Sequence, residues 1–379
     1  MTAIYCSPIS WLLLHAGFTP PIEFIDPSPL SLLPSRHEYD SPQTRSFIMT
    51  SEAATAAKIG VIGMSIHGPI LVTGAAGRVG AVGRMIVEML RQRDLPVRAL
   101  VHREDERAEA LRALGAEVVV GDLTRAGDVA RAMAGCHRMY FGMSVSAPYL
   151  EATVTAAAVA RKQGDPEVFV NISQMTVSQM SLTAMTDSPQ HRQHWLAEQV
   201  LNWSGLPVVQ VRPTVFLQNF FFLAWAAESI AKDATIRLPF GTGRTSPVDA
   251  RDVAEVVATI LANPTAHIGK VYELTGPRSW DLHALAAEYS NALGRTITYV
   301  DVPLEQWRDQ ELRDRNLPDH VFAHLLTMAR LHAANRYDRL TPDVEAITGR
   351  PAISCREFVV RHAALFRPTN PPTKGSGAT

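Results

Sequence analysis

The chain has 379 residues, 46% hydrophobic and 19% charged, which is enough to bury a sizeable core in one large α/β domain or in two lobes. Its formal charge is -1, so no basic field is available to hold nucleic acid, and we expect no direct nucleic-acid partner. Only three cysteines occur, and they are far apart, so the sequence predicts neither a disulfide framework nor a thiolate metal site and favours a reducing cytoplasm.

The N-terminal segment, residues 1–65, differs in composition from the rest because it is rich in Pro and Ser. Its apolar run at Trp11–Leu14 has no basic residue before it and is far shorter than the ~20 residues of a membrane-spanning helix. We expect a disordered extension, or an upstream start ahead of Met49 or Met64, with a cleaved targeting peptide as the alternative. No membrane association is expected, and residues 367–379 are expected to be a disordered tail.

From Pro69 onward, short apolar runs alternate with helical patterns, which is typical of repeated βαβ units around a parallel sheet. The runs are predominantly apolar, as expected of strands that are covered on both faces. The sequence therefore predicts an α/β fold with a doubly wound parallel sheet of Rossmann type. Its expected strands are Ile70–Thr73, Val97–Val101, Glu117–Val120, Arg138–Phe141, Val168–Ile172, Val208–Val211 and Val271–Leu274.

After Arg212 the rhythm changes, and strands become scarce. We expect a smaller, mostly helical C-terminal substrate lobe, with Asp249 as a helix N-cap and Gly294 as a helix stop. Residues 66–366 would then form one domain, with a nucleotide-binding core at about 69–212 plus 271–274 and the lobe from the remainder. The helical patterns cover 216–231, 250–262, 282–293 and 318–334.

A glycine-rich turn follows the first expected strand and leads into a helix, with the sequence Val72-Thr73-Gly74-Ala75-Ala76-Gly77-Arg78-Val79-Gly80. Gly74 would permit the tight turn, Gly77 would let the backbone approach a pyrophosphate, and Gly80 would let the helix pack closely on the strand. The N-terminus of the helix would supply unpaired N–H groups to the phosphates. The sequence predicts a dinucleotide site on residues 74–80.

The end of the second strand indicates which dinucleotide is bound, because a carboxylate there favours NAD(H). That place reads Val101-His102-Arg103. Arg103, helped by Arg78, could bind a 2′-phosphate, although a solvated loop charge is the alternative. We expect NADP(H) to be preferred over NAD(H). Asp122, followed by Leu123 after the third strand, could contact the adenine amine or cap the next helix.

Together with later segments, the glycine turn resembles the NmrA-like family of atypical short-chain dehydrogenases/reductases. The resemblance extends from Pro69 to about Phe366 and implies NAD(P)H binding, a substrate cleft beside the nicotinamide and no metal. It also implies two kinds of member, which are quinone-type reductases and redox-sensing regulators without activity. The segments that carry it are Gly121-Asp122-Leu123, Val211–Asn219, Pro247–Ala254, Tyr272–Pro277 and Ile347–Pro351.

The wider superfamily pairs a Tyr with a Lys four residues later, so that the Tyr can protonate a developing alkoxide. Here Gln190 and His194 stand in those places, and Ser173 stands at the expected place of the catalytic Ser. Gln190 cannot act as an acid. His194 could donate a proton near neutral pH or bond the nicotinamide ribose, which makes it the candidate catalytic residue.

Two further histidine patterns were weighed. His191, His194 and Glu198 could share one helical face, but no additional ligand cluster supports a metal site, and none is expected. His320 and His324 form a similar pair, which we interpret as surface or packing residues.

Open α/β sheets bind ligands at the carboxyl ends of their strands, so residues that follow the strands are expected to line the cleft. Its Met and aromatic members could equally be core. We expect an NADPH-dependent oxidoreductase that passes a hydride to a small acceptor, possibly a quinone. The alternative is a non-catalytic NADP(H) sensor that binds a regulatory protein partner. The candidates are Met143, Ser144, Ser173, His194 and Pro213 for the cofactor, and Gln174, Met175, Phe216 and Asn219 for the substrate.

Overall fold

The structure is a computed structural model that describes residues 68–77 and 81–368. Its centre is a seven-stranded, entirely parallel sheet in the order β3-β2-β1-β4-β5-β6-β8. The expected doubly wound sheet of Rossmann type is confirmed. The strands are β1 (Ile70–Thr73), β2 (Val97–Val101), β3 (Glu117–Val120), β4 (Arg138–Phe141), β5 (Val168–Ile172), β6 (Val208–Pro213) and β8 (Val271–Leu274).

Six of these strands begin and end at the residues that the sequence predicts. β6 is longer than expected because Arg212 and Pro213 continue the ladder with Glu273 and Leu274 of β8. The expectations for residues 1–65, for most of the tail and for Arg78, Val79 and Gly80 fall outside the described residues.

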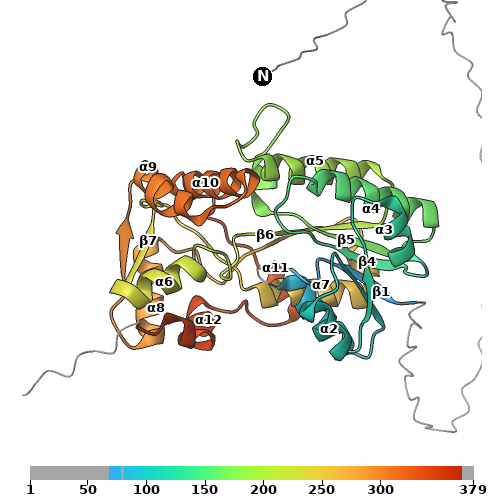
Figure 1. Cartoon of the computed structure of the whole chain (residues 1–379), viewed down its shortest axis with the longest axis horizontal. Helices are drawn as coiled ribbons and strands as arrows, with labels where there is room; N and C mark the ends of the chain where they lie inside the picture. The colour runs from blue at the N-terminus through green and yellow to red at the C-terminus, as the bar shows by residue number, and fades with distance from the viewer. Residues whose placement is uncertain (1–67, 78–80, 369–379) are drawn as a thin grey trace, which may run out of the picture. The chain divides into compact units, whose positions relative to one another are not determined.

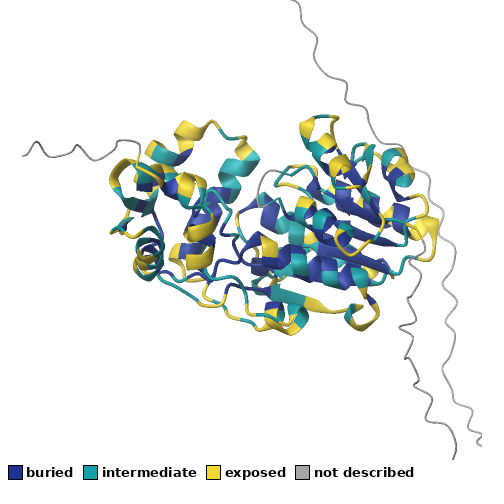
Figure 2. Ribbon diagram, turned by 90° about the horizontal axis from the view of Figure 1, so that it is seen from below, coloured by how far each residue is buried: buried dark blue, intermediate teal, exposed yellow. Residues whose placement is uncertain are grey.

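Helices cover both faces of the sheet (Figure 1). Successive β1 side chains point to opposite faces, so Val72 packs toward α1 and α7, and Leu71 packs toward α3, α4 and α5. Figure 2 shows the inner strands of the sheet as deeply buried, whereas the edge strands β3 and β8 are partly exposed. One layer consists of α1 (Val82–Arg91), α2 (Glu106–Ala113), α7 (Ala250–Ala262) and α11 (Asp343–Thr348), and the other of α3 (Ala126–Met133), α4 (Tyr149–Gln163) and α5 (Pro189–Trp203).

Helix α7 belongs to this sheet domain, although the sequence analysis placed residues 250–262 in the second lobe. Val253 and Val257 share a hydrophobic core with Ile86 of α1. The expected cap is confirmed, because the Asp249 carboxylate accepts a 2.8 Å hydrogen bond from the Arg251 N–H. The chain therefore returns to the sheet before it completes the second lobe.

The second lobe has its own core and is mostly helical, as expected. It also contains a parallel pair of four-residue strands, β7 and β9, which the sequence analysis missed. A run of four residues such as Thr-Ile-Arg-Leu is too short for the alternation of a strand to be distinguished from the end of a helix. The lobe comprises α6 (Ala224–Asp233), β7 (Thr235–Leu238), α8 (Leu282–Leu293), β9 (Thr298–Asp301), α9 (Leu304–Trp307), α10 (Asp319–Ala333) and α12 (Cys355–Arg361).

The helix expected at 216–231 is only partly correct, because α6 begins at Ala224. Phe216 instead forms a bridge with Val248, and the Asn219 side chain accepts a 3.2 Å hydrogen bond from the Phe221 N–H. Phe221 and Phe222 are fully buried, so an irregular segment produces the apolar spacing that resembled a helix. The expected stop at Gly294 is confirmed by its left-handed backbone. Within the described residues, no helix combines the length and apolarity that crossing a membrane requires.

His332 of α10 is a buried, neutral histidine in the core of this lobe. Its ring stacks on Phe240 at 4.1 Å and on Tyr337 at 3.9 Å between centroids, and its Nδ1–H donates to the Met328 carbonyl at 2.8 Å. Burial lowers the pKa of His332 to about 3. In the unfolded chain the same ring binds a proton near pH 6.5, so acid favours unfolding.

We therefore expect His332→Phe to reduce the loss of stability in acid. A histidine whose folded pKa is depressed stabilises fully above its unfolded pKa, and that stability is lost as the pH falls from about 6.5 toward 3. At pH 5.5 about 1.4 kcal/mol of this stability has been lost. Urea unfolding at pH 8 and pH 5.5 should show a smaller drop for His332→Phe than for the wild type. His283→Phe, at an exposed position of α8, should keep the full drop.

Candidate functional site

The glycine turn is held by the ends of two neighbouring strands. The Thr73 hydroxyl donates to the Gly142 carbonyl and accepts from the Gly142 N–H, both at 2.9 Å. Gly74 has a positive φ of 65°, and a Cβ there would lie 2.5 Å from the Gly142 carbonyl oxygen. The Gly77 N–H donates to the Gly74 carbonyl at 3.0 Å, which closes the turn. Glycine is therefore required at position 74 by its positive φ and by the close approach of the Gly142 backbone.

A further glycine, Gly83, brings α1 against the turn. A Cβ on Gly83 would lie 2.8 Å from the Gly74 carbonyl oxygen and 2.8 Å from the Ala75 Cα. The sequence analysis assigned this close packing to Gly80, which lies outside the described residues. The missed signal was a glycine just inside the predicted helix. No described side chain caps α1, and the first N–H groups of a helix can bind an anion.

Two arginines lie near the end of β2, and they differ in their contacts. Arg107 forms an ion pair with Asp105 and donates a 2.8 Å hydrogen bond to the Ala76 carbonyl in the turn. Arg103 is exposed, and its side chain forms no bond to any described residue. The Asp122 carboxylate accepts hydrogen bonds from Thr124, which lower its pKa, and it does not cap α3. The helix-cap alternative for Asp122 was therefore wrong.

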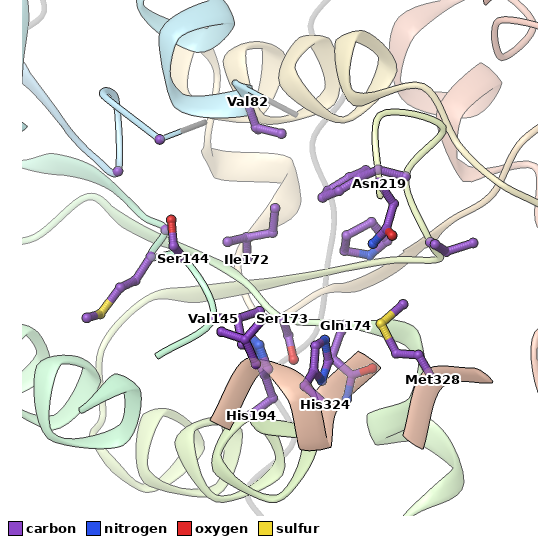
Figure 3. Close-up of a pocket in the computed structure, with 18 of the residues that line it drawn as sticks. Val82, Ser144, Val145, Ile172, Ser173, Gln174, His194, Asn219, His324 and Met328 are labelled. Carbon is purple, nitrogen blue, oxygen red and sulfur yellow. The ribbon is translucent and has the colours of Figure 1, made fainter. Parts of the chain in front are cut away.

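A cavity of about 400 Å³ lies where the glycine turn and the strand ends meet the second lobe. This volume is in the range of small-molecule sites. Figure 3 shows His194 of α5 and His324 of α10 reaching into the cavity on the side opposite Val82. The expected residues that line it are Gly74, Gly77, Met143, Ser144, Ser173, Gln174, His194, Pro213, Phe216 and Asn219.

The structure does not bring every expected residue to this cavity. Met175 is 1% exposed and packs inside a short 3-10 helix, so its expected place in the substrate cleft was wrong. Leu123 packs in the core beneath α3 and α4. Four further expected residues lie outside the lining. Two are in the glycine turn, Ala75 and Ala76, and two follow the ends of β2 and β3, Arg103 and Asp122.

Among the described residues, the lining contains no Asp, Glu, Lys or Arg. Its wall from the second lobe is apolar and includes Phe220, Leu325 and Met328, with Asn219 among its few polar groups. Away from the glycine turn, a charged group would lose its hydration without gaining a counter-ion from the described lining. That part of the cavity therefore suits an uncharged, largely apolar group.

The histidines of the cavity are neutral. Burial, together with the nearby His324 ring, lowers the pKa of His194 to about 3, and burial lowers the pKa of His324 to about 3 as well. His194 is therefore uncharged at pH 7 and does not fit the role of a proton donor at that pH. Its alternative role, a hydrogen bond to a ligand, stays a prediction.

His320 and His324 pack α10 against α5, and His324 also lines the cavity. The His324 Nδ1 contacts the Ser188 hydroxyl at 3.0 Å, and the His320 Nε2 bonds the Gln190 side chain at 2.8 Å. Both histidines thereby link α10 to the start of α5. Residues more than 100 positions apart share this network, which no local pattern in the sequence reveals.

A buried ion pair fixes α5 to the sheet. The Arg212 guanidinium of β6 donates to both Glu198 carboxylate oxygens, at 2.9 and 2.5 Å, and the Glu198 side chain is 1% exposed. Glu198 is therefore not a free ligand, and the described residues contain no group of three or more His, Cys, Asp or Glu that could hold a metal. The pair sets the position of the helix that carries His194.

Four polar atoms in the cavity lining are buried without a hydrogen-bond partner among the described residues. They are Ser173 Oγ, Gln174 Nε2, His194 Nδ1 and Thr214 Oγ1. Buried polar groups are nearly always paired, and an unpaired one costs about 1–3 kcal/mol. Seven further atoms of this kind lie elsewhere among the described residues, so these four mark the polar positions of the cavity wall.

A parallel sheet of this strand order, a glycine turn before α1 and a cavity at the strand ends define a Rossmann-type fold with a ligand site at its carboxyl edge. Comparison with protein families agrees. The chain belongs to the NmrA-like family, whose model matches residues 67–352.

Relatives of the chain include enzymes and a regulator. The chain is 29% identical over 292 residues to an NAD(P)H azoreductase of Xenophilus azovorans, which covers 76% of this chain and 97% of that protein. The structure resembles an NADPH-dependent quinone oxidoreductase of Escherichia coli, with TM-score 0.67, 21% identity and coverage of 78% and 99%. It also resembles NmrA, a negative transcriptional regulator solved with NADP, with TM-score 0.63, 17% identity and coverage of 78% and 95%. At these sequence identities, the two structural similarities show a shared fold.

Proposed function

We propose that this chain is an NADPH-dependent oxidoreductase that reduces a small, uncharged acceptor such as a quinone. The observation that carries the proposal is the cavity itself, where the glycine turn meets an apolar wall and four unpaired polar atoms. The azoreductase and the quinone oxidoreductase among its relatives support this class of reaction.

The residues present fit a nicotinamide dinucleotide. Gly74 and Gly77 allow the close backbone turn after β1, and the start of α1, which no described side chain caps, can receive a pyrophosphate. Ser173 and Thr214 offer unpaired hydroxyls at the ends of β5 and β6. Such a cofactor would supply the hydride, and the protein would position the acceptor and exclude water from it.

A quinone-like acceptor suits the absence of the Tyr and Lys pair. Reduction of a quinone produces a delocalised aromatic oxyanion, which is far less basic than an alkoxide and needs a weaker proton donor. The neutral lining, with Gln174 and Asn219 as hydrogen-bonding groups, can orient such a ring without a charged residue.

Steady-state assays with NADPH and a panel of quinones, azo dyes and flavins would test the proposal. We expect turnover with uncharged quinones, and weaker turnover with sulfonated analogues because the cavity offers no cation to pair with the sulfonate. Cofactor binding without turnover of any acceptor would contradict the proposed enzymatic function.

The second candidate is a non-catalytic NADP(H) sensor that binds a protein partner. It is favoured by Gln190 and His194 in the places of Tyr and Lys, and by the likeness to a transcriptional regulator. Such a protein would bind its partner with an affinity that depends on the ratio of NADP⁺ to NADPH. Partner binding that ignores the cofactor would remove this candidate.

We propose that Arg103 selects NADP(H) over NAD(H), and we expect Arg103→Ala to weaken NADPH far more than NADH. Arg107 already bonds Asp105 and the turn, whereas Arg103, near the end of β2, bonds none of the described residues. A charge-assisted bond to the 2′-phosphate contributes about 1.5–3 kcal/mol, which is roughly tenfold to a hundredfold in Kd. Calorimetric titration of wild type and variant with both cofactors measures the difference.

The matched control is Arg161→Ala, which removes an exposed arginine from the C-terminal end of α4. It should leave both affinities unchanged. Equal losses of NADPH and NADH affinity in Arg103→Ala would mean that Arg103 does not contact the 2′-phosphate. The contribution of Arg78, outside the described residues, would place the single substitution at the low end of the range.

A further inference from the structure

The side chain of Gln190 is almost completely buried, at 1% exposure, and its amide has a fixed orientation. The Ser146 backbone N–H lies 3.1 Å from Gln190 Oε1, and a backbone N–H can only donate. The atom that faces Ser146 must therefore be the amide oxygen. His320 Nε2, at 2.8 Å from the same oxygen, must donate to it as well.

This orientation determines what His194 can do. With the oxygen directed to Ser146 and His320, the Gln190 NH₂ group faces His194 Nε2 at 3.2 Å. An amide NH₂ only donates, so His194 Nε2 must accept and cannot carry a proton. Since His194 is neutral, its one proton resides on Nδ1.

The resulting Nδ1–H is the atom that has no partner. His194 Nδ1 is buried, unpaired among the described residues, and belongs to a side chain that lines the cavity. The ring is also held by Tyr149, with 4.2 Å between centroids, and Tyr149 is itself tied to the Ile172 carbonyl. A donor that is oriented from two sides and left unpaired is prepared for an acceptor atom of a ligand.

We infer that Gln190 is a positioning residue that locks His194 in the Nδ1–H tautomer, so that His194 presents a neutral hydrogen-bond donor to an oxygen of the bound ligand. That oxygen is either a hydroxyl or carboxamide of the cofactor or a carbonyl of the acceptor. The identity of the ligand rests on the proposed function, whereas the tautomer does not. His194 thus binds and orients through its N–H and transfers no proton of its own.

Nitrogen NMR of the full chain with ¹⁵N-labelled histidine tests the tautomer without any ligand. A His194→Gln variant assigns the resonance. We expect the wild type at pH 7 to show a protonated Nδ1 and an unprotonated Nε2. A proton on His194 Nε2 in the wild type, in the neutral ring or in the imidazolium, would overturn the inference.

Gln190→Glu replaces the NH₂ donor that faces His194 Nε2 by an oxygen, and the size of the side chain hardly changes. Once ionised, the Glu carboxylate can still accept from Ser146 and His320, but it presents only an acceptor to His194 Nε2, so a proton must move onto Nε2. Because burial raises the pKa of a carboxyl group, the spectra of both variants are compared from about pH 7 to pH 9, where the carboxylate forms. The control is Gln199→Glu, which adds the same charge to α5 where the side chain bonds only the Trp195 carbonyl. Nε2 should become protonated in the first variant and not in the second. Protonation in both variants, or in neither, would refute a direct role of Gln190.

Addition of NADP⁺ alone, and then of NADP⁺ with an uncharged quinone, identifies the oxygen. A shift of the His194 Nδ1 resonance with NADP⁺ alone assigns the donor to the cofactor, and a shift only with both assigns it to the acceptor. Absence of any shift while both bind would remove the ligand contact. If turnover occurs, Gln190→Glu should lower kcat/KM about tenfold or more, beyond Gln199→Glu. Absence of turnover would count against the proposed function and leave the tautomer standing.

Discussion

Glu198→Ala is expected to destabilise the protein by about 3–5 kcal/mol, the largest effect of any single substitution that we predict. The Glu198 side chain is 1% exposed and takes both of its hydrogen bonds from Arg212, whose side chain is 18% exposed. Removing the carboxylate leaves a largely buried guanidinium whose next acidic neighbour, Glu273, lies 3.8 Å away. Urea unfolding at pH 7 gives the free energy of unfolding directly.

Two controls separate this effect from the general loss of an ion pair. Glu109→Ala breaks a surface pair with Arg112 on α2, and it should change stability by less than about 1 kcal/mol because water screens exposed charges. The double variant Glu198→Leu with Arg212→Met should recover part of the loss, since the unpaired charge is then absent. A cost for Glu198→Ala as small as that for Glu109→Ala would mean that Arg212 is hydrated in solution.

The ion pair also bears on the site. α5 carries both Gln190 and His194, and Glu198 lies on the same helix one turn beyond His194. Its anchor, Arg212, directly precedes Pro213 and Thr214 of the cavity lining. In Glu198→Ala we therefore expect weaker ligand binding as well as lower stability, because the middle of α5, one turn beyond His194, is no longer fixed to the end of β6.

Gly74→Ala is expected to lower stability by about 3 kcal/mol and to weaken cofactor binding by more than tenfold. The backbone of Gly74 has φ of 65°, and an alanine in this conformation costs about 1–3 kcal/mol. The new Cβ would also meet the Gly142 carbonyl oxygen at 2.5 Å, so β1 and β4 must move apart at the place where their ends support the turn. Urea unfolding and NADP⁺ titration measure the two effects.

Gly127→Ala is the matched control for this substitution. Gly127 lies inside α3, and a Cβ there would meet nothing within 4 Å. Alanine is the better helix former, so we expect this variant to be unchanged or more stable by up to about 1 kcal/mol, with cofactor binding intact. If Gly74→Ala behaved like Gly127→Ala, the close approach at the turn would not be a constraint of the folded protein.

Most of the sheet could be predicted from the sequence, for a physical reason. Strands covered by helices on both faces are mostly apolar, so Val168–Ile172 and its neighbours are visible as short apolar runs even where one polar residue interrupts them. The strand, glycine turn and helix also follow one another in the chain. Their geometry depends on local φ angles and on the size of nearby residues, which the sequence specifies directly.

The second lobe was predicted less well because its pattern is ambiguous. Phe221 and Phe222 are fully buried on irregular backbone, and their apolar spacing imitates a helix. The strands β7 and β9 pair across about 60 residues, and neither is long enough to show a period. Helix α7 was assigned to the wrong part because an apolar face does not state which core it joins.

The parallel sheet, the glycine turn after β1, the family and several residues of the cavity lining follow from the amino-acid sequence, because each depends on short-range pattern and backbone sterics. The protonation and hydrogen bonding of the site depend on how the chain folds. His194 is neutral because the fold buries it. Its hydrogen-bonding direction is set by Gln190, whose amide is oriented by Ser146 in the loop before α4 and by His320 of α10. Burial and hydrogen-bond partners are properties of segments brought together from distant parts of the chain, so a pattern along the chain cannot contain them.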